Sequence, residues 1–440
     1  MRKIICSVLF LITFSLSAQD FDKAKMDSLF AVIEENHKGM GNVALSKNGE
    51  IIYQNSIGFS DLENQVRNTE NTKFRIGSIS KTFTAAIIMQ LVEEGKLQLD
   101  TKLSAFYPGV PNASEISIED LLRHQSGLFN FTNKEEYLEY LEESKSKEEL
   151  LEIFKENGTV FSPGEKNEYS NTNYVLLSFI AEDVDKSSFK DILDERIAAP
   201  FQLEDTYFGG KIDTANGEAL SYTKKGDRVL GTETNMNIPM GAGGVVSTAS
   251  DLTKFFAALF NGEVVKTESL EQMKTMANGY GMGLFRYPYN NKTFYGHDGG
   301  IDGFSSMAVY APGEDLAIAY TSNAKDFAIG DIVVGVMSIY YGNEYAIPVF
   351  APELDIPSEE LKKFSGTYSK EGFPLKLSIF VEDGVLMGQG SGQPPFPLEA
   401  FGQNKFQFVP AGLKLEFFVD QDKVTVLQAG NSTELTREKN

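Results

Sequence analysis

A proline-rich segment near the end of the chain divides the sequence into two parts of different texture. Residues 346–357 hold Pro348, Pro352 and Pro357, with acidic residues between them. Repeated proline removes backbone N–H donors and disfavours both a helix and a central strand, so we expect a linker here. Beyond it, short alternating segments predict a small antiparallel β domain over residues 358–440. The strands expected in it are 375–381, 385–389, 406–409, 413–419 and 424–428.

The longer part before the linker mixes helical and strand patterns. Asn48-Gly49 lies between two apolar segments and can supply the positive φ angles of a type I′ turn, so we expect a hairpin over residues 41–61. Residues 78–94 repeat apolar side chains every four positions and end at Gly95, as a helix with a glycine cap does. Further helices are expected over 134–156, over 174–180 and after a cap at Ser250, and further strands over 293–295, 305–310 and 316–320.

The first 18 residues have the three-part layout of a secretory signal peptide. A basic start at Arg2 and Lys3 precedes the apolar run 4–16, and small residues follow up to Ala18. An N-terminal anchor helix is the alternative, but the run is shorter than the ~20 apolar residues that a membrane span needs. We therefore expect an exported protein, periplasmic or secreted. The only cysteine, Cys6, lies in this segment, so the mature chain needs no disulfide.

Charge and composition exclude several classes of function. Lys and Arg total 40 against 62 Asp and Glu, a formal net charge of −22, and such a chain repels nucleic-acid backbones and anionic membranes. With three His and one Cys, the chain has no material for a Cys/His zinc cluster. We expect no metal, no cofactor and no nucleic-acid partner, and no stable membrane insertion after the signal is removed. The composition does not set the oligomeric state.

Ser78 and Lys81 form the first candidate catalytic pair. An alcohol is a poor nucleophile unless a base lies within hydrogen-bond reach, and a desolvated lysine can be that base because burial lowers its pKa. At the start of a helix, both side chains would share one face, and the backbone N–H groups there favour developing negative charge. Ser-x-x-Lys also occurs at residues 144, 187, 221 and 322, but only Ser78 follows a glycine and precedes an apolar, Ala-rich helix.

Two further segments carry polar groups that suit acyl transfer. Tyr169 and Asn171 lie in a turn-forming loop before an apolar helix, where a phenol near a lysine ammonium could be pushed toward phenolate and relay protons. The alternative is a structural role, in which Tyr169 packs against neighbouring side chains and Asn171 caps a helix. His297 begins a glycine-dense strand edge that a substrate backbone can approach closely, although an isolated histidine is more often structural. We expect His124 to hold a loop by hydrogen bonds.

Taken in order, these segments resemble the serine β-lactamase-like hydrolases, and more narrowly the group of class C β-lactamases, D-Ala-D-Ala carboxypeptidases and esterases. The likeness rests on Ser78-x-x-Lys81, the Tyr169-Ser170-Asn171 loop and the His297-Asp298-Gly299 strand, with added support from residues 124–128 and 241–248. It implies an α+β fold over residues 19–345, in which an antiparallel sheet flanked by helices adjoins a mostly helical subdomain. The small C-terminal domain resembles the β modules that some members append.

The resemblance also assigns roles. Ser78 becomes the acyl-accepting nucleophile, Lys81 its base and Tyr169 a proton shuttle. The backbone N–H groups of Ser78 and Gly300 become the oxyanion hole. Asn171, Gly299 and His297 become substrate-binding residues.

His297 stands where most β-lactamases of this class have lysine, and the anion of Asp298 follows it, which weakens the case for recognition of a substrate carboxylate. We therefore expect an exported serine hydrolase acting on D-amino-acid or cell-wall peptides or on esters. A β-lactamase or penicillin-binding protein is the alternative. A binding or sensor protein on the same scaffold and an acyltransferase remain open as well.

Overall fold

The computed structural model describes residues 21–438, apart from 226, 325, 351–353, 355, 371–375, 392–394, 409–410 and 429–430. The expected signal peptide, residues 1–18, lies outside the described residues. In the part of the chain that is described, no helix is both long and apolar enough to cross a membrane.

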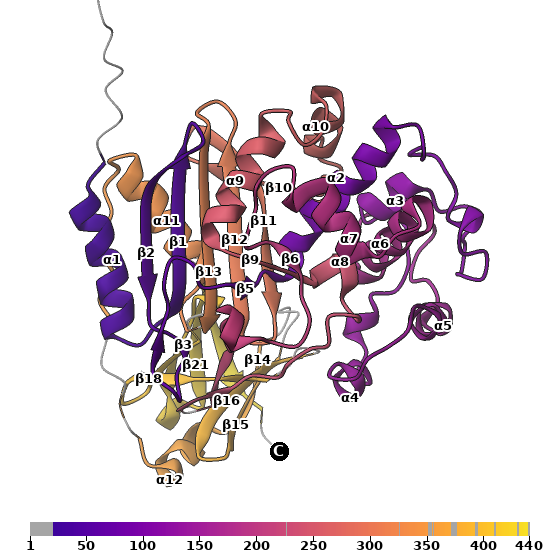
Figure 1. The fold of residues 1–440 in the computed structure, drawn as a ribbon. Coiled ribbons are helices and arrows are strands. Elements are labelled where there is room, and N and C mark those ends of the chain that lie inside the picture. Colours follow the sequence, from indigo (N-terminus) through magenta and orange to yellow (C-terminus); the bar gives the residue numbers. More distant parts are fainter. Residues whose placement is uncertain are drawn as a thin grey trace, which may run out of the picture.

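The central element is an antiparallel sheet built from both ends of the part of the chain that precedes residue 346 (Figure 1). Its strands, in spatial order, are β10 (Phe285–Tyr289), β11 (Lys292–Ile301), β12 (Phe304–Ala311), β13 (Leu316–Ala324), β1 (Met40–Lys47) and β2 (Glu50–Ile57). The hairpin of β7 (Tyr222–Lys225) and β8 (Asp227–Leu230) joins through β13. Asn48 and Gly49 have φ angles of 52° and 77°, so the expected hairpin turn is confirmed.

Helices cover the two faces of this sheet. Alternation along β1 sends Val43 and Leu45 to one apolar core and Ala44 to the other. The first core lies under α1 (Lys23–Glu35) and α11 (Ile329–Tyr340). The second core lies under α9 (Ala249–Phe260) and continues into the helical subdomain. The sheet is therefore buried on both faces.

The helical subdomain lies beside the sheet (Figure 1) and surrounds α2 (Ser80–Glu93), whose side chains are buried on nearly every side. The other helices are α3 (Ile118–Leu122), α4 (Tyr137–Tyr140), α5 (Lys147–Asn157), α6 (Asn171–Asp185), α7 (Phe189–Leu193), α8 (Met240–Gly243) and α10 (Thr267–Lys274). Short strands connect the two parts: β3 (Phe59–Asp61) pairs with β4 (Val66–Arg67), and β9 (Val245–Ser247) lies between β5 (Phe74–Arg75) and β6 (Tyr207–Phe208).

Two local expectations were wrong. Residues 134–156 do not form one helix, because Ser146 and Glu149 make a reciprocal capping box that begins α5 separately from α4. Ser250 is not the cap of α9, because the side chain of Thr248 accepts the hydrogen bond from the backbone N–H of Asp251 and begins the helix two residues earlier.

The C-terminal residues form a second antiparallel sheet, which lies below the first in Figure 1 and follows the short helix α12 (Ser358–Leu361). Its strand order is β17 (Phe396–Pro397), β16 (Val385–Gly390), β15 (Leu377–Glu382), β14 (Gly366–Ser369), β22 (Asn431–Arg437), β21 (Lys423–Gln428), β20 (Leu413–Phe418), β19 (Lys405–Phe408) and β18 (Glu399–Gly402). The described residues between α11 and α12 form neither helix nor strand. Glu399 joins the two parts, because its carboxylate lies 2.8 Å from Lys38 Nζ and 2.7 Å from Lys224 Nζ.

Candidate active site

Ser78 lies in a tight turn between strand β5 and helix α2. Residues Gly77–Ile79 form one 3₁₀ turn and α2 begins at Ser80, slightly later than expected. Gly77 has φ of 51°, and a Cβ atom there would lie 2.7 Å from the backbone nitrogen of Gly300. Only glycine suits both the positive φ angle and the close approach of Gly300. The turn therefore places Ser78 directly against the end of β11.

Lys81 is fully buried beneath Ser78 and has three close polar neighbours. Its Nζ lies 3.0 Å from Ser78 Oγ, 2.8 Å from Asn171 Oδ1 and 2.7 Å from the carbonyl oxygen of Ala242. Burial lowers the pKa of Lys81 well below its ordinary value, while the charge of Asp298 opposes that shift. The structure therefore favours the neutral amine at this position.

The neighbours of Lys81 decide how a neutral amine would orient. Asn171 Oδ1 and the Ala242 carbonyl can only accept hydrogen bonds, and a neutral amine has two N–H groups to donate. Both donors are then used, and the lone pair of the nitrogen faces Ser78 Oγ. This is the orientation that a base needs to take the hydroxyl proton.

Tyr169 lies beside the same pair. Its ring centroid is 4.8 Å from Lys81 Nζ and 4.5 Å from the ring of His124. Burial raises the pKa of Tyr169, and a hydrogen bond with Ser78 opposes this only in part. The expected push toward phenolate is therefore wrong: because Lys81 is itself desolvated, the resting phenol keeps its proton and can donate it.

The loop that carries Tyr169 is fixed by hydrogen bonds. His124 Nδ1 accepts from the backbone N–H of Ser170 at 3.1 Å, which is the loop-holding position expected for this histidine. Asn171 begins α6, and its side-chain nitrogen donates to Thr132 Oγ1 at 3.0 Å while its oxygen faces Lys81. The amide of Asn171 is thereby oriented from both ends.

Strand β11 supplies the opposite wall of the site. His297 is 3% exposed, and burial lowers its pKa to about 4. The imidazole is therefore neutral near pH 7. At Gly299, a Cβ atom would lie 2.0 Å from the carbonyl oxygen of Ile76 and 3.0 Å from the nitrogen of Ser78. Gly300 is exposed beside them, so the two backbone nitrogens expected to form an oxyanion hole belong to adjoining segments.

An ion pair that sequence reasoning missed connects these two segments. Arg75, three residues before Ser78, and Asp302, two residues after Gly300, lie 3.0 Å apart with side chains 1% and 2% exposed. Asp302 also accepts hydrogen bonds from the backbone and hydroxyl of Thr234. No sequence signal joins residues this far apart. The Ala242 carbonyl was also missed, because a backbone acceptor has no residue-type signature.

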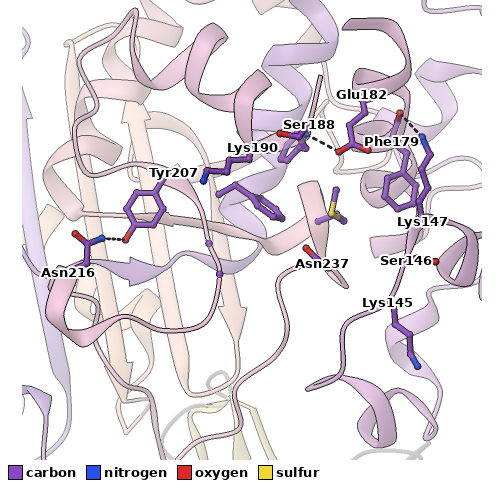
Figure 2. Close-up of a pocket in the computed structure, with 15 residues that line it drawn as sticks. Lys145, Ser146, Lys147, Phe179, Glu182, Ser188, Lys190, Tyr207, Asn216 and Asn237 are labelled. Atoms are coloured by element: carbon purple, nitrogen blue, oxygen red, sulfur yellow. Dashed lines mark hydrogen bonds between the residues drawn. The ribbon is translucent and has the colours of Figure 1, made fainter. Parts of the chain in front are cut away.

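A cavity of about 340 Å³ opens at Ser78. Ser78, Asn171, Gly300 and Asp302 contribute to its lining, which otherwise is formed by Phe131, Thr132, Tyr137, Leu138, Leu141, Thr232, Thr234, Pro239, Ala242, Gly243 and Ile301. A larger cavity, of about 810 Å³, contains none of the predicted catalytic residues (Figure 2). Lys147, Lys190 and Tyr207 are among its lining residues, and Asn237 and Met240 belong to the same segment whose Pro239 lines the smaller one. Among the described residues, no group of three His, Cys, Asp or Glu side chains could hold a metal.

An antiparallel sheet packed against a helical subdomain, with Ser78, Lys81 and Tyr169 together at their junction, defines a serine hydrolase of the β-lactamase and penicillin-binding protein type. The chain belongs to the Beta-lactamase family, whose family model matches residues 26–331.

Three relatives illustrate the range of this family. Penicillin-binding protein 4* of Bacillus subtilis (strain 168) is 26% identical over 427 residues, which are 90% of this chain and 91% of that protein. The teichoic acid D-alanine hydrolase of Staphylococcus aureus is 26% identical over 220 residues, 50% of this chain and 54% of the relative. A solved structure of the D-amino acid amidase from Ochrobactrum anthropi SV3, complexed with L-phenylalanine amide, has a TM-score of 0.63 at 26% identity and covers 72% of this chain and 99% of its own.

Proposed function

We propose that this protein is an exported serine acyl hydrolase that forms a covalent acyl-enzyme on Ser78 and acts on D-amino-acid or cell-wall peptides or on esters. The observation that carries this proposal is the position of Lys81 Nζ, 3.0 Å from Ser78 Oγ, with both N–H groups of its neutral form used by Asn171 and Ala242. A lysine held in this way is a base and not a surface charge.

In the proposed first step, Ser78 Oγ bonds to the substrate carbonyl carbon and its proton passes to Lys81. The developing oxyanion lies against the backbone N–H groups of Ser78 and Gly300, and losing one such donor typically costs about 3 kcal/mol of transition-state stabilisation. The protonated phenol of Tyr169 donates to the leaving group as the bond to the carbonyl breaks. Water then attacks the acyl-enzyme, and the same groups move protons in reverse to release the acid.

The choice of substrate rests on the β11 wall and on the relatives. A neutral His297 and the anionic side chain of Asp298 give a substrate carboxylate no cation to bind. Two relatives are named for D-configured substrates, a D-alanine hydrolase and a D-amino acid amidase. We therefore rank D-aminoacyl amides and peptides with small esters, and β-lactams after them. Export is proposed from residues 1–18, and N-terminal sequencing of the mature protein tests it.

The test of the proposal is intact mass spectrometry after treatment with a fluorophosphonate. The wild type should gain one adduct, and Ser78→Ala should gain none. Ser144→Ala is the matched control, because Ser144 has the same Ser-x-x-Lys spacing on an exposed segment. An adduct that persists in Ser78→Ala would remove Ser78 from the mechanism. Turnover of D-Ala peptides, p-nitrophenyl esters and nitrocefin then ranks the substrates.

A further inference from the structure

Asp298 is an exposed carboxylate at the rim of the site. Among the described residues, no Lys, Arg or His side chain lies within ion-pair distance of it. By contrast, Asp302 is paired with Arg75, and Asp326 with Arg228. The side chain of Asp298 accepts a hydrogen bond at Oδ1 from the hydroxyl of Tyr287, at 2.7 Å. The carboxylate therefore keeps acceptor capacity that faces water.

The position of Asp298 places this charge next to the proposed chemistry. It precedes Gly299, where a Cβ atom would lie 3.0 Å from the backbone nitrogen of Ser78. It follows His297, whose ring centroid is 6.4 Å from that of Tyr169. The charge of Asp298 acts on both Lys81 and Tyr169. Asp298 thus lies on the Tyr169 side of the site, the side to which the leaving group departs in the proposed mechanism.

Aromatic rings continue from this carboxylate in a row. Tyr287 donates a hydrogen bond to Asp298, and its ring centroid lies 6.4 Å from that of Phe285. The ring centroid of Phe285 lies 5.6 Å from that of Tyr280, which in turn lies 6.5 Å from that of Tyr169. The faces of aromatic rings attract cations, and a carboxylate beside them strengthens that preference. We name Asp298, Tyr287, Phe285 and Tyr280 the rim cluster.

The charges around the adjoining cavity favour a cation over an anion. The lining of the Ser78 cavity includes no Lys or Arg among the described residues. The chain as a whole has a net charge of −22, so its long-range field attracts cations. An anionic leaving group would meet repulsion at Asp298, and a cationic one would meet attraction.

We propose that the rim cluster binds a positively charged group, an ammonium or quaternary ammonium, on the leaving portion of the substrate. This inference rests on the proposed function. In the reaction, the bond from the carbonyl carbon to the leaving oxygen or sulfur breaks, the Ser78 ester forms, and the leaving atom takes the proton. The amino alcohol or amino thiol departs with its charge intact, and water later releases the acid.

The test compares substrates that differ in the charge of the leaving group. Acetylthiocholine carries a quaternary ammonium, and 3,3-dimethylbutyl thioacetate is its neutral isostere. The wild type should have a kcat/KM about tenfold higher for the cationic thioester, as a partly screened charge pair gives. In Asp298→Asn this ratio should fall close to one, and added salt should reduce it in the wild type. Glu359→Gln, which removes an exposed acid in the C-terminal part, should keep the ratio.

The outcomes separate this inference from the proposed function. A ratio near one in the wild type, or the same ratio in Asp298→Asn, overturns the role of the rim cluster while hydrolysis of the neutral thioester still supports the serine hydrolase. Absence of turnover of either thioester, together with no fluorophosphonate adduct on Ser78, overturns the proposed function itself. A preference for D-alanine p-nitroanilide over N-acetyl-D-alanine p-nitroanilide that disappears in Asp298→Asn would place the charge on the acyl portion and contradict the assignment to the leaving side.

Discussion

The charge states around Lys81 arise from burial, and each has a chemical consequence. A buried amine next to neutral His297 and His124 and a protonated Tyr169 leaves Asp298 as the anion that acts on it. Desolvation lowers the pKa of Lys81, and the charge of Asp298 opposes this shift. The pH–rate profile of acylation has an acid limb where Lys81 takes up a proton, and the pH of that limb therefore depends on one exposed carboxylate.

This dependence gives a prediction of pH behaviour. Lys81 acts as a base when neutral, so the acylation rate falls as the pH falls through its pKa. Removing the anion in Asp298→Asn destabilises the ammonium, lowers the pKa of Lys81 further and moves the acid limb to lower pH. The rate of fluorophosphonate labelling against pH measures this shift. Glu359→Gln should leave the limb in place, and an upward shift in Asp298→Asn would contradict the electrostatic account.

For the individual residues, the sequence indicated which side chains form the site but not their protonation states. Ser78, Lys81, Tyr169 and Asn171 were predicted from local motifs, and the structure brings all four side chains together. The direction of the Tyr169 pKa shift was predicted wrongly, because it depends on how much solvent reaches the ring. That quantity is a property of packing between distant segments, which a motif does not contain.

Among the elements, the turn before α2 and the end of β11 work as one unit. Gly77 contacts Gly300 through backbone, and the pair of Arg75 with Asp302 holds the same two segments from the side. Asp302 also accepts hydrogen bonds from the backbone N–H and the hydroxyl of Thr234, so the loop of Thr234, which lines the Ser78 cavity, is fixed to these two segments. The geometry of the proposed oxyanion hole therefore depends on residues that do not touch the substrate carbonyl.

Asp302→Asn should lower the free energy of unfolding by about 3 kcal/mol, because it leaves the buried Arg75 without its closest buried countercharge. It should also reduce kcat more than it raises KM, since the oxyanion contact strengthens in the transition state. Chemical denaturation and steady-state kinetics measure the two effects. Glu233→Gln is the matched control: Glu233 pairs with the same arginine but is 34% exposed, so its loss should cost no more than about 1 kcal/mol.

The prediction of elements succeeded for most strands and failed at helix boundaries that polar residues decide. The strands around Asn48-Gly49 and in β12, β13, β15 and β20 were expected and are confirmed. The break between α4 and α5 was missed because a charged stretch has helical propensity throughout. Its only signal is the Ser146-Glu149 box, and for α9 the corresponding signal is Thr248-Asp251.

In the whole molecule, the two sheets are joined by a carboxylate shared between two lysines. Glu399 of the C-terminal sheet is 13% exposed and pairs with Lys38, which precedes β1, and with Lys224 of β7. The sequence predicted the C-terminal strands but gave no indication of what they contact. Contacts between segments this far apart are set by tertiary packing and leave no local pattern.

Glu399→Gln should lower the free energy of unfolding by about 3 kcal/mol, and it should lower the midpoint temperature of thermal unfolding as well. The reason is that the buried Lys38 loses the countercharge that Glu399 provides. Differential scanning calorimetry measures the change. Glu434→Gln is the control within the same sheet: its pair with Lys423 is 53% and 35% exposed, so the expected loss is at most about 1 kcal/mol. Equal effects of the two substitutions would argue against an energetic connection through Glu399.

The placement of β1 has a consequence for how the protein is made. This strand lies between β2 and β13, and its register pairs Met40 with Ala324. A nascent polypeptide that ends before β13 offers the early hairpin no neighbour on that side, and such distant pairings form slowly. The catalytic crevice therefore comes into being only late in translation, and a fragment truncated before residue 316 has no means of completing it.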